Sequence, residues 1–213
     1  IVVAYGKIIP KTILDIPKHG VLNVHPSLLP KFRGPSPIES AILSDLTSTG
    51  VTIILLDEET DHGPIVAQRT YQGPTLNATS PRSDIEWPPK GSELADALAR
   101  EGGVLLAEII PEWVSGRRKA HPQDHGSATF TKKITKEDGF LDLSGDALMN
   151  YKKIRAFDKW PGAHFFIERN GHKMRVVVSE ARYENGVLTI TRVIPEGKRA
   201  MSYEDFLRGT KLN

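Results

Sequence analysis

Three short apolar runs at the start of the chain constrain the fold most. They are residues 1–4, 21–24 and 51–56, which are apolar apart from Asn23 and Thr52. Nearly continuous apolar runs of this length are typical of parallel strands that are covered on both faces. The residues between them carry prolines near the expected helix starts and predict short helices over 10–16 and 38–46. We therefore expect an α/β domain with a parallel sheet.

Polar residues lie at or just after the ends of two of these runs. Asn23 and His25 end the second run, and because strand residues alternate between faces, both side chains point to the same side. Asp61 follows the third run, and at the carboxyl ends of parallel strands the three side chains can converge. An Asn can donate to a developing oxyanion, a His can move protons near neutral pH, and an Asp can orient the His. Since no Ser or Cys is placed as a nucleophile, the set suggests direct acyl transfer to an amine.

Two other interpretations of these residues stay open at this point. Asn23 could cap a turn while His25 is an ordinary loop histidine. Alternatively, His25, Asp57, Asp61 and His62 could bind zinc, although their spacing matches no common set of metal ligands. We expect no metal.

The rest of the first half predicts one more strand and a long helix. Residues 64–68 follow the third run too closely for a crossover, so we expect an antiparallel strand there. Residues 72–90 are rich in Pro, Ser, Thr and Asn and predict a long surface loop. Residues 91–115 carry apolar side chains at helical spacing, but the pair Gly102 and Gly103 predicts a kink or a split in that helix.

The pattern changes after residue 116. Residues 117–127 are basic, contain His and Pro, and show no periodicity. We expect them to link a domain over residues 1–116 to a second domain over 128–213. Two serines are expected to act as helix N-caps, Ser36 for the helix over 38–46 and Ser144 for a helix over 145–157.

The second domain is predicted to be a small antiparallel β structure. Short strands are expected over 164–167, 174–181 and 187–193, with Asn-Gly pairs at 170–171 and 185–186 that favour type I′ turns. A barrel of the kind that binds oligonucleotides would fit this pattern. The net charge is only +2, but Lys and Arg recur in clusters from Arg117 onward, so a polyanionic partner is plausible.

The composition is that of a globular protein in a reducing compartment. The chain has 39% hydrophobic and 25% charged residues, and it has no cysteine. It contains no apolar run of the roughly 18 residues that a membrane span needs. We expect a cytoplasmic protein without a membrane contact.

Longer motifs connect the chain to a known family. Residues 3–10, residues 23–34 with His-Pro-Ser-Leu-Leu-Pro at their centre, and residues 57–65 resemble the formyltetrahydrofolate-dependent formyltransferases. The greatest likeness is to the members that act on methionyl-tRNA. The second half agrees, because it resembles the C-terminal domain of those enzymes at residues 129–139, 154–157, 160–163 and 198–201.

This resemblance implies a fold, a reaction and a set of site residues. The fold would be a partial Rossmann-like formyltransferase domain followed by an OB-like β-barrel that binds tRNA. The reaction would move a formyl group from 10-formyltetrahydrofolate to the α-amine of initiator methionyl-tRNA, and the complete enzyme would be a monomer. Asn23 and His25 would stabilise the oxyanion, and Asp61 would pair with His25 and assist proton transfer. The residues implied in folate binding are Tyr5, Gly6, Lys7, Ile8, Ile9, Asp57 and Asp61. The residues implied in binding the acceptor are Ser27, Leu28, Leu29, Pro30 and Arg33.

The resemblance leaves two questions open, namely whether the chain is a fragment and which acceptor it uses. The chain opens inside a β-type run without an initiator Met, so we expect a fragment that lacks the preceding βα units, and its activity alone is an open question. A formyltransferase that acts on a nucleotide-linked amino sugar is the nearest alternative, and a tRNA-binding fragment without activity is another. A glycinamide ribonucleotide formyltransferase is disfavoured, because that enzyme has no second domain corresponding to residues 132–208.

Overall fold

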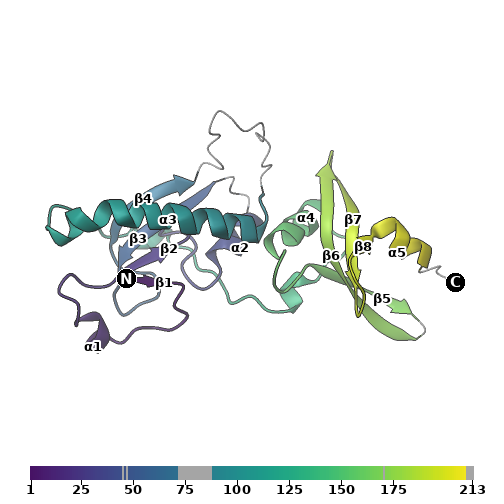
Figure 1. Cartoon of the computed structure of the whole chain (residues 1–213), viewed down its shortest axis with the longest axis horizontal. Coiled ribbons are helices and arrows are strands. Elements are labelled where there is room, and N and C mark those ends of the chain that lie inside the picture. The colour runs from purple at the N-terminus through teal and green to yellow at the C-terminus, as the bar shows by residue number, and fades with distance from the viewer. Residues whose placement is uncertain (45, 47, 72–87, 170, 210–213) are drawn as a thin grey trace. The chain divides into compact units, whose positions relative to one another are not determined.

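The chain divides into two compact units. The computed structural model describes residues 1–44, 46, 48–71, 88–169 and 171–209. Unit 1 comprises the described residues of Ile1–Trp87 and Glu93–Lys133, and unit 2 comprises those of Pro88–Ser92 and Ile134–Asn213. Each unit has its own four-stranded sheet, as Figure 1 shows. The surface loop expected over 72–90 falls mostly outside the described residues.

The sheet of unit 1 is mixed. Its strands lie in the order β1 (Val2–Val3), β2 (Leu22–His25), β3 (Thr49–Leu55) and β4 (Ile65–Tyr71). The strands β1 and β2 pair in parallel, and β3 and β4 pair antiparallel, as the sequence predicted. The strand β3 also pairs antiparallel with β2, so the prediction that the three apolar runs form parallel strands was wrong for β3. A central strand that is buried on both faces has the same apolar sequence whichever way it runs, and six of the seven β3 residues are buried.

Helix α3 (Gly91–Val114) runs unbroken past the glycine pair, so the predicted kink or split does not occur. It packs on the side of the sheet that Val24 faces. A β-carbon built at Gly102 would lie 2.5 Å from the Cγ1 atom of Val24, whereas one at Gly103 would meet nothing within 4 Å. Gly102 therefore lets the helix approach β2 closely. The apolar stripe of this helix is buried, as predicted, at Leu94, Leu98, Leu105 and Ile109.

Two short helices accompany the sheet of unit 1. They are α1 (Lys11–Leu14) and α2 (Pro37–Leu43). Ser36 stands at the N-cap position of α2 but makes no side-chain capping bond, because its hydroxyl donates instead to the Lys132 carbonyl at 2.6 Å. The expected cap is thus replaced by a contact with a distant part of the same unit.

The segment that we expected to be a linker lies along unit 1. It contains a 3-10 helix (His125–Ser127), and the backbone of His121 forms a β-bridge with Ile65 at the start of β4. Further along, Thr129 and Thr131 hydrogen-bond through their backbones to Arg33 at 2.9 and 2.7 Å. These contacts attach residues 121–131 to the start of β4 and to the loop after β2.

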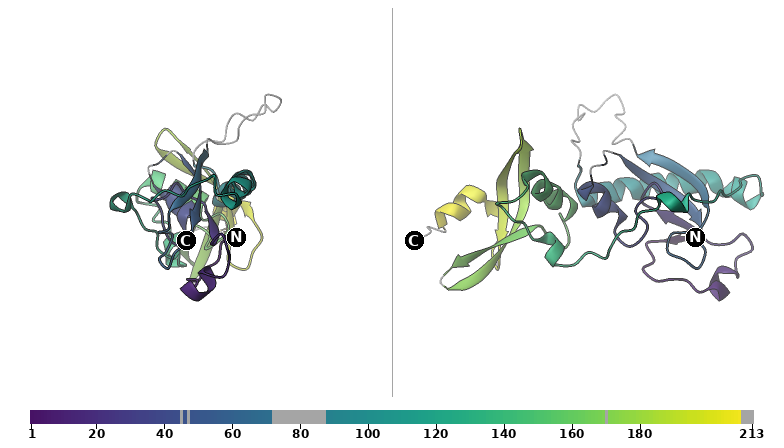
Figure 2. Two further views of the ribbon diagram at one scale, coloured as in Figure 1. Left: turned by 90° about the vertical axis from the view of Figure 1, so that its left-hand side faces the viewer. Right: turned by 180° about the vertical axis from the view of Figure 1, so that it is seen from behind.

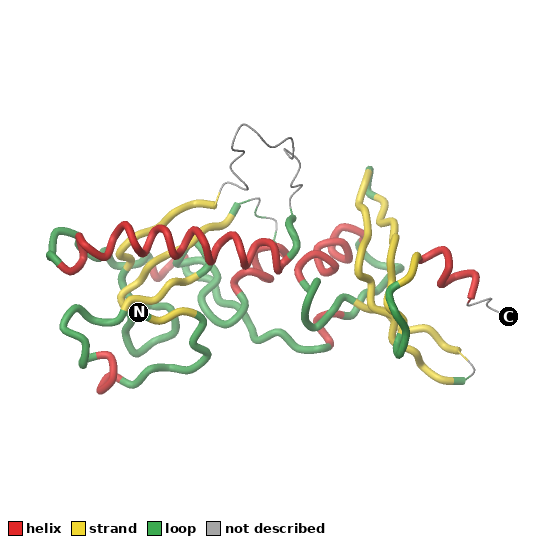
Figure 3. The backbone as a smooth tube through the Cα atoms, viewed as in Figure 1, coloured by secondary structure: helices red, strands yellow, loops and turns green. Residues whose placement is uncertain are grey.

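Unit 2 is built on an antiparallel sheet. A 3-10 helix (Glu137–Gly139) and α4 (Ala147–Ala156) precede β5 (His164–Arg169), β6 (His172–Glu184), β7 (Val187–Pro195) and β8 (Met201–Ser202), and α5 (Tyr203–Gly209) ends the described chain. Figure 2 shows β6 and β7 as a long hairpin in yellow-green. Its turn has positive φ at Asn185 and Gly186, as a type I′ turn requires. The backbone trace of Figure 3 shows the helices and strands of each unit, and in unit 2 the strands β5 to β8 follow one another between α4 and α5.

Two expectations for unit 2 change. The N-cap of α4 is Asp146, whose carboxylate accepts from the amides of Leu148 and Met149, and not Ser144. A sheet order of β5-β6-β7-β8 leaves β5 and β8 unpaired with each other in the described residues, so the barrel is not confirmed. The core of the unit instead lies between the sheet and its helices, and it is formed by Leu141, Ile154, Ala163, Phe165, Val176, Val178, Val193 and Phe206.

No helix in the described part of the chain has both the length and the apolar character that crossing a bilayer requires.

Candidate active site

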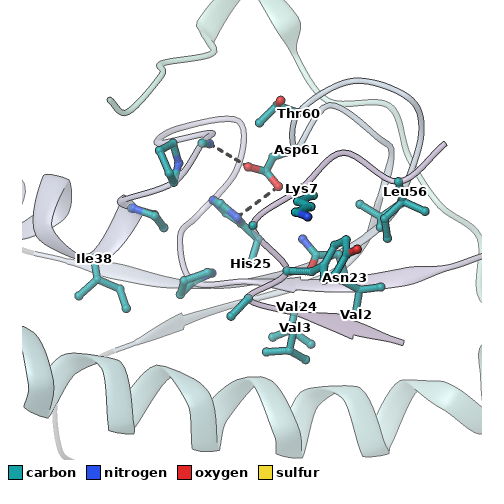
Figure 4. A pocket seen from close by; sticks show the side chains of 18 of the residues that line it. Val2, Val3, Lys7, Asn23, Val24, His25, Ile38, Leu56, Thr60 and Asp61 are labelled. Carbon is teal, nitrogen blue, oxygen red and sulfur yellow. Dashed lines mark hydrogen bonds and ion pairs between the residues drawn. The ribbon is translucent and has the colours of Figure 1, made fainter. Parts of the chain in front are cut away.

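The site is centred on the end of β2. Asn23 and His25 point to one side of this strand, while Val24 points to the other side toward α3 (Figure 4). Both polar side chains are held in a nearly closed environment, since Asn23 is 9% and His25 is 4% exposed. The Asn23 side chain makes no hydrogen bond to any residue that the structure describes, so its amide is available to a ligand.

The His25 imidazole is oriented by two partners. Its Nε2 atom lies 3.0 Å from the carbonyl oxygen of Phe32, which can only accept, so Nε2 carries a proton. Its Nδ1 atom lies 3.5 Å from the Oδ1 atom of Asp61, longer than an ordinary hydrogen bond. Burial lowers the pKa of His25, and the Asp61 charge and the Phe32 carbonyl oppose that effect only in part. The lowered pKa favours a neutral ring near pH 7, with Nδ1 as a free acceptor beside Asp61.

Asp61 reaches His25 by a route that the sequence did not predict. Because β3 runs antiparallel to β2, its carboxyl end lies beside the start of β2, at Leu22, and away from His25. The loop between β3 and β4 carries Asp61 back over the sheet. There the Asp61 Oδ2 atom accepts the Gly34 amide at 2.8 Å, and its backbone takes a left-handed conformation with φ of 48°.

These three side chains line one cavity of about 590 Å³. Its volume lies in the range of small-molecule sites, roughly 300 to 1,000 Å³. The wall also contains every residue that the resemblance implied in folate binding, namely Tyr5, Gly6, Lys7, Ile8, Ile9, Asp57 and Asp61. A site with an apolar wall and a few convergent polar groups is what binding of a partly aromatic ligand requires.

The residues implied in acceptor binding do not line the cavity beside Asn23, His25 and Asp61. Leu28, Leu29 and Pro30 line a second, smaller cavity of about 290 Å³. Ser27 is fully buried, and its hydroxyl donates to the Lys31 carbonyl at 2.6 Å. Arg33 is 3% exposed, so its side chain is buried in unit 1, and its role in acceptor binding stays a prediction.

Arg33 instead belongs to a network inside unit 1. Its Nη2 atom donates to the Oε1 atom of Gln123 at 2.7 Å and to the Nδ1 atom of His125 at 2.9 Å. The His125 ring stacks on the His62 ring with centroids 4.0 Å apart, and the His62 Nδ1 atom donates to Asp57 at 2.6 Å. In the part of the chain that the structure describes, no group of three or more His, Asp or Glu side chains is arranged to hold a metal.

Two polar residues near the site were missed by the sequence reasoning. Gln123 is 5% exposed and bonds to the loop that carries Asp61. Thr52 is fully buried, and its hydroxyl donates to the Ser27 carbonyl at 2.6 Å and accepts from the Leu29 amide at 3.1 Å. A lone Thr inside an apolar strand was a weak signal for Thr52, and nothing in the local sequence singled out Gln123.

Comparison with protein families gives matches in both halves of the chain. Residues 1–74 match a formyl transferase family model, and residues 133–186 match the model of a formyl transferase C-terminal domain. The methionyl-tRNA formyltransferase of Chloroflexus aurantiacus is 40% identical over 188 residues, which are 87% of this chain and 56% of that protein. The enzyme of the same name from a Roseiflexus species is 35% identical, and the match covers 100% of this chain and 68% of that protein. The chain thus spans between about half and two thirds of the length of these curated relatives.

Solved structures share the fold. A methionyl-tRNA formyltransferase from Clostridium thermocellum matches with a TM-score of 0.63 and 22% identity, covering 93% of this chain and 75% of that one. A Mycobacterium tuberculosis protein thought to be a sugar N-formyltransferase matches with a TM-score of 0.61 and 26% identity, over 80% of this chain and 68% of that one. HypX from Aquifex aeolicus, solved with tetrahydrofolic acid, matches with a TM-score of 0.62 and 19% identity, over 89% of this chain and 35% of that one.

The cavity beside Asn23, His25 and Asp61 lies in the half that matches the formyl transferase model, and the sequence identity extends over the whole chain. The chain therefore belongs to the methionyl-tRNA formyltransferase family.

Proposed function

We propose that this chain carries the catalytic centre for transfer of a formyl group from 10-formyltetrahydrofolate to the α-amine of initiator methionyl-tRNA. The observation that carries the proposal is the convergence of Asn23, His25 and Asp61 on one cavity whose wall is formed by residues 5–9. The bound folate would supply the formyl carbon and the N10 atom that leaves. The family assignment gives the reaction class, and the site geometry gives each residue a role.

The free amide of Asn23 is the donor for the negative charge that develops on the formyl oxygen. It makes no bond to the described residues that it would first have to give up. Removal of one such donor from an oxyanion site costs about 100- to 1,000-fold in rate. In this conformation the Nε2 proton of His25 is committed to Phe32, so we assign Asn23 the larger share of oxyanion stabilisation.

His25 and Asp61 act together on the amine. The Nδ1 atom of His25 and the Oδ1 atom of Asp61 are two acceptors 3.5 Å apart in the cavity wall, so an attacking amine can donate to both. As the new carbon–nitrogen bond forms, the amine gives one proton to His25, whose charge Asp61 stabilises. When the bond from the formyl carbon to N10 breaks, His25 returns this proton to N10. The products are a formamide and tetrahydrofolate, and the proton count balances.

Unit 2 is the part that we propose to bind tRNA. Its Lys173 ammonium lies 4.2 Å from the centre of the Phe166 ring, and the half-exposed Phe166 and Phe140 rings stack on each other. Cations beside exposed aromatic rings suit a nucleic acid. In this proposal unit 1, to which the segment 117–133 belongs, is catalytic, and unit 2 is a barrel-like tRNA-binding domain. A monomer in the cytoplasm, where translation begins, would fit this activity.

The acceptor decides between this proposal and its nearest alternative. The alternative acceptor is a nucleotide-linked amino sugar, because the Mycobacterium tuberculosis protein with a similar fold is thought to be a sugar N-formyltransferase. The purified chain is supplied with formyl-labelled 10-formyltetrahydrofolate and with either methionyl-initiator tRNA or a dTDP-amino sugar, and the labelled product is quantified. We expect transfer to the tRNA only. Transfer to the amino sugar, or no transfer to either acceptor together with no folate binding, would overturn the proposal.

A further inference from the structure

A glutamine from the segment after α3 holds the backbone on which Asp61 stands. The Nε2 atom of Gln123 donates to the carbonyl oxygen of Asp61 at 2.8 Å and to that of Gly63 at 2.7 Å. The Oε1 atom of the same amide accepts from Nη2 of Arg33 at 2.7 Å and from Nε at 3.2 Å. Both donors and both acceptor positions of the amide are therefore used. The orientation of the amide is unambiguous, because a guanidinium can only donate and must face the oxygen.

The backbone that Gln123 holds is strained at the functional residue. Asp61 has a φ of 48°, in the left-handed region that residues with a side chain rarely adopt. Such conformations persist when the surrounding structure fixes them. Gln123 fixes this one by bonding to carbonyls on both sides of His62, while the Gly34 amide holds the carboxylate end at 2.8 Å.

Arg33 ties these two anchors together. Its buried side chain orients the Gln123 amide, and the next residue, Gly34, provides the amide that Asp61 accepts. The Arg33 backbone is itself fixed, since its amide donates to Thr129 at 2.9 Å and its carbonyl accepts from Thr131 at 2.7 Å. Loss of the Gln123 amide would therefore free the Asp61 backbone while the Gly34 anchor remains.

We propose that Gln123 is a positioning residue for the reaction, which clasps the Asp61–Gly63 backbone so that the Asp61 carboxylate faces the His25 imidazole. The proposal rests on the proposed function for its link to catalysis, but its structural part can be tested without turnover. His25 and Gln123 share no hydrogen bond in the described structure, so the test isolates the part of the effect of Gln123 on His25 that depends on the Asp61 charge.

The experiment measures how strongly Asp61 acts on His25. The His25 ring is titrated by NMR in the whole chain, first with Asp61 and then with Asp61→Asn. The difference between the two titration midpoints is the coupling, because the Asp61 charge raises the pKa of His25. The same pair is then measured in a Gln123→Met background. We expect the coupling to fall by at least about half, since the coulombic effect weakens with distance. An unchanged coupling in a folded Gln123→Met protein would overturn the proposal.

Two further variants keep the test decisive. If Gln123→Met does not fold, Gln123→Glu replaces it, because a glutamate keeps the acceptor for Arg33 and loses only the two donated bonds. Its own charge cancels in the difference between Asp and Asn at position 61. Gln68→Glu is the matched control, since the Gln68 amide also donates two bonds, to the Leu29 carbonyl at 2.9 Å and the Thr52 hydroxyl at 2.8 Å, but does not touch Asp61. We expect the coupling to stay unchanged in Gln68→Glu.

A kinetic measurement separates this proposal from the proposed function. If both hold, Gln123→Met lowers kcat, but by a smaller factor than Asp61→Asn does, because the carboxylate is displaced and not removed. A loss of coupling without any formyl transfer by the wild-type chain would keep the positioning role and reject the function. If the coupling is retained in Gln123→Met and the wild-type chain transfers formyl groups, the proposed function stands and the positioning role of Gln123 is rejected.

Discussion

Substitution of Gly63 by Ala tests whether the loop that carries Asp61 is shaped by close backbone packing. A β-carbon at Gly63 would lie 1.8 Å from the carbonyl oxygen of Leu55 and 3.0 Å from its carbonyl carbon. Real β-carbons essentially never come within 3.0 Å of another heavy atom, so the loop must move by more than about 1 Å. The obstacle is backbone at the end of β3, which cannot turn aside as a side chain can.

The cost can be worked out from the bonds that such a shift breaks. The Leu55 amide donates to the Pro64 carbonyl at 3.0 Å, and Gln123 donates to the Gly63 carbonyl at 2.7 Å. Each broken bond leaves a partly buried polar group unsatisfied, at a cost of roughly 1 to 3 kcal/mol. We therefore expect a loss of about 3 kcal/mol for Gly63→Ala, and a Tm lower by about 6 to 12 °C.

Calorimetry measures the Tm of Gly63→Ala and of a control variant, Gly103→Ala. Gly103 lies in α3 with nothing within 4 Å of a built β-carbon, so the same substitution there should stabilise the helix by about 0.5 to 1 kcal/mol. We also expect the effect of the Asp61→Asn substitution on the titration midpoint of His25 to become smaller in Gly63→Ala, but not in Gly103→Ala. A Gly63→Ala protein with wild-type Tm and wild-type coupling would refute the packing argument.

Three more outcomes follow from the structure. Gly102→Ala should destabilise by about 1 to 3 kcal/mol in urea unfolding, because its β-carbon would lie 2.5 Å from Cγ1 of Val24, and a stabilised protein would contradict this. Thr52→Val should cost about 3 kcal/mol in the same measurement, since the Thr52 hydroxyl takes part in three hydrogen bonds, and a cost below about 0.5 kcal/mol would contradict this. Because burial lowers the pKa of His25, the unfolded state binds its proton first, so stability should fall as pH drops below about 6.5, by at most about 1.4 kcal/mol per pH unit. Comparison with His25→Gln isolates this slope, and identical slopes in the two proteins would contradict the assignment.

Strand periodicity predicted the start of the site but not its completion. The spacing of Asn23 and His25 put both on one side of β2, and the structure agrees, because that inference needs only local geometry. The direction of β3 could not be predicted in this way, since its residues are buried on both faces and pair antiparallel with both neighbours. Asp61 was predicted to lie near His25 because both were expected at the carboxyl ends of parallel strands. The strand β3 runs antiparallel to β2, so the loop after β3 and not the strand direction brings Asp61 to His25.

Contacts between distant residues explain most of the remaining differences. Gln123 bonds to carbonyl groups 60 and 62 positions away in sequence, and such pairs leave no local pattern. The buried Arg33 side chain bonds to Gln123 and His125, which also lie about ninety positions away, so no local pattern could predict its partners. Gly102 was taken as a weak point of a helix, whereas it permits close packing against Val24.

The most direct test of the account is the single-turnover rate of formyl transfer to methionyl-initiator tRNA in Asn23→Ala, His25→Ala and Asp61→Asn, with the Kd for 5-formyltetrahydrofolate measured alongside. If these side chains act on the reacting atoms, each rate should fall by about 100-fold or more, while the Kd changes little in Asn23→Ala and His25→Ala. Rates within about threefold of wild type in all three variants would contradict the assignment of this site as the formyl-transfer centre.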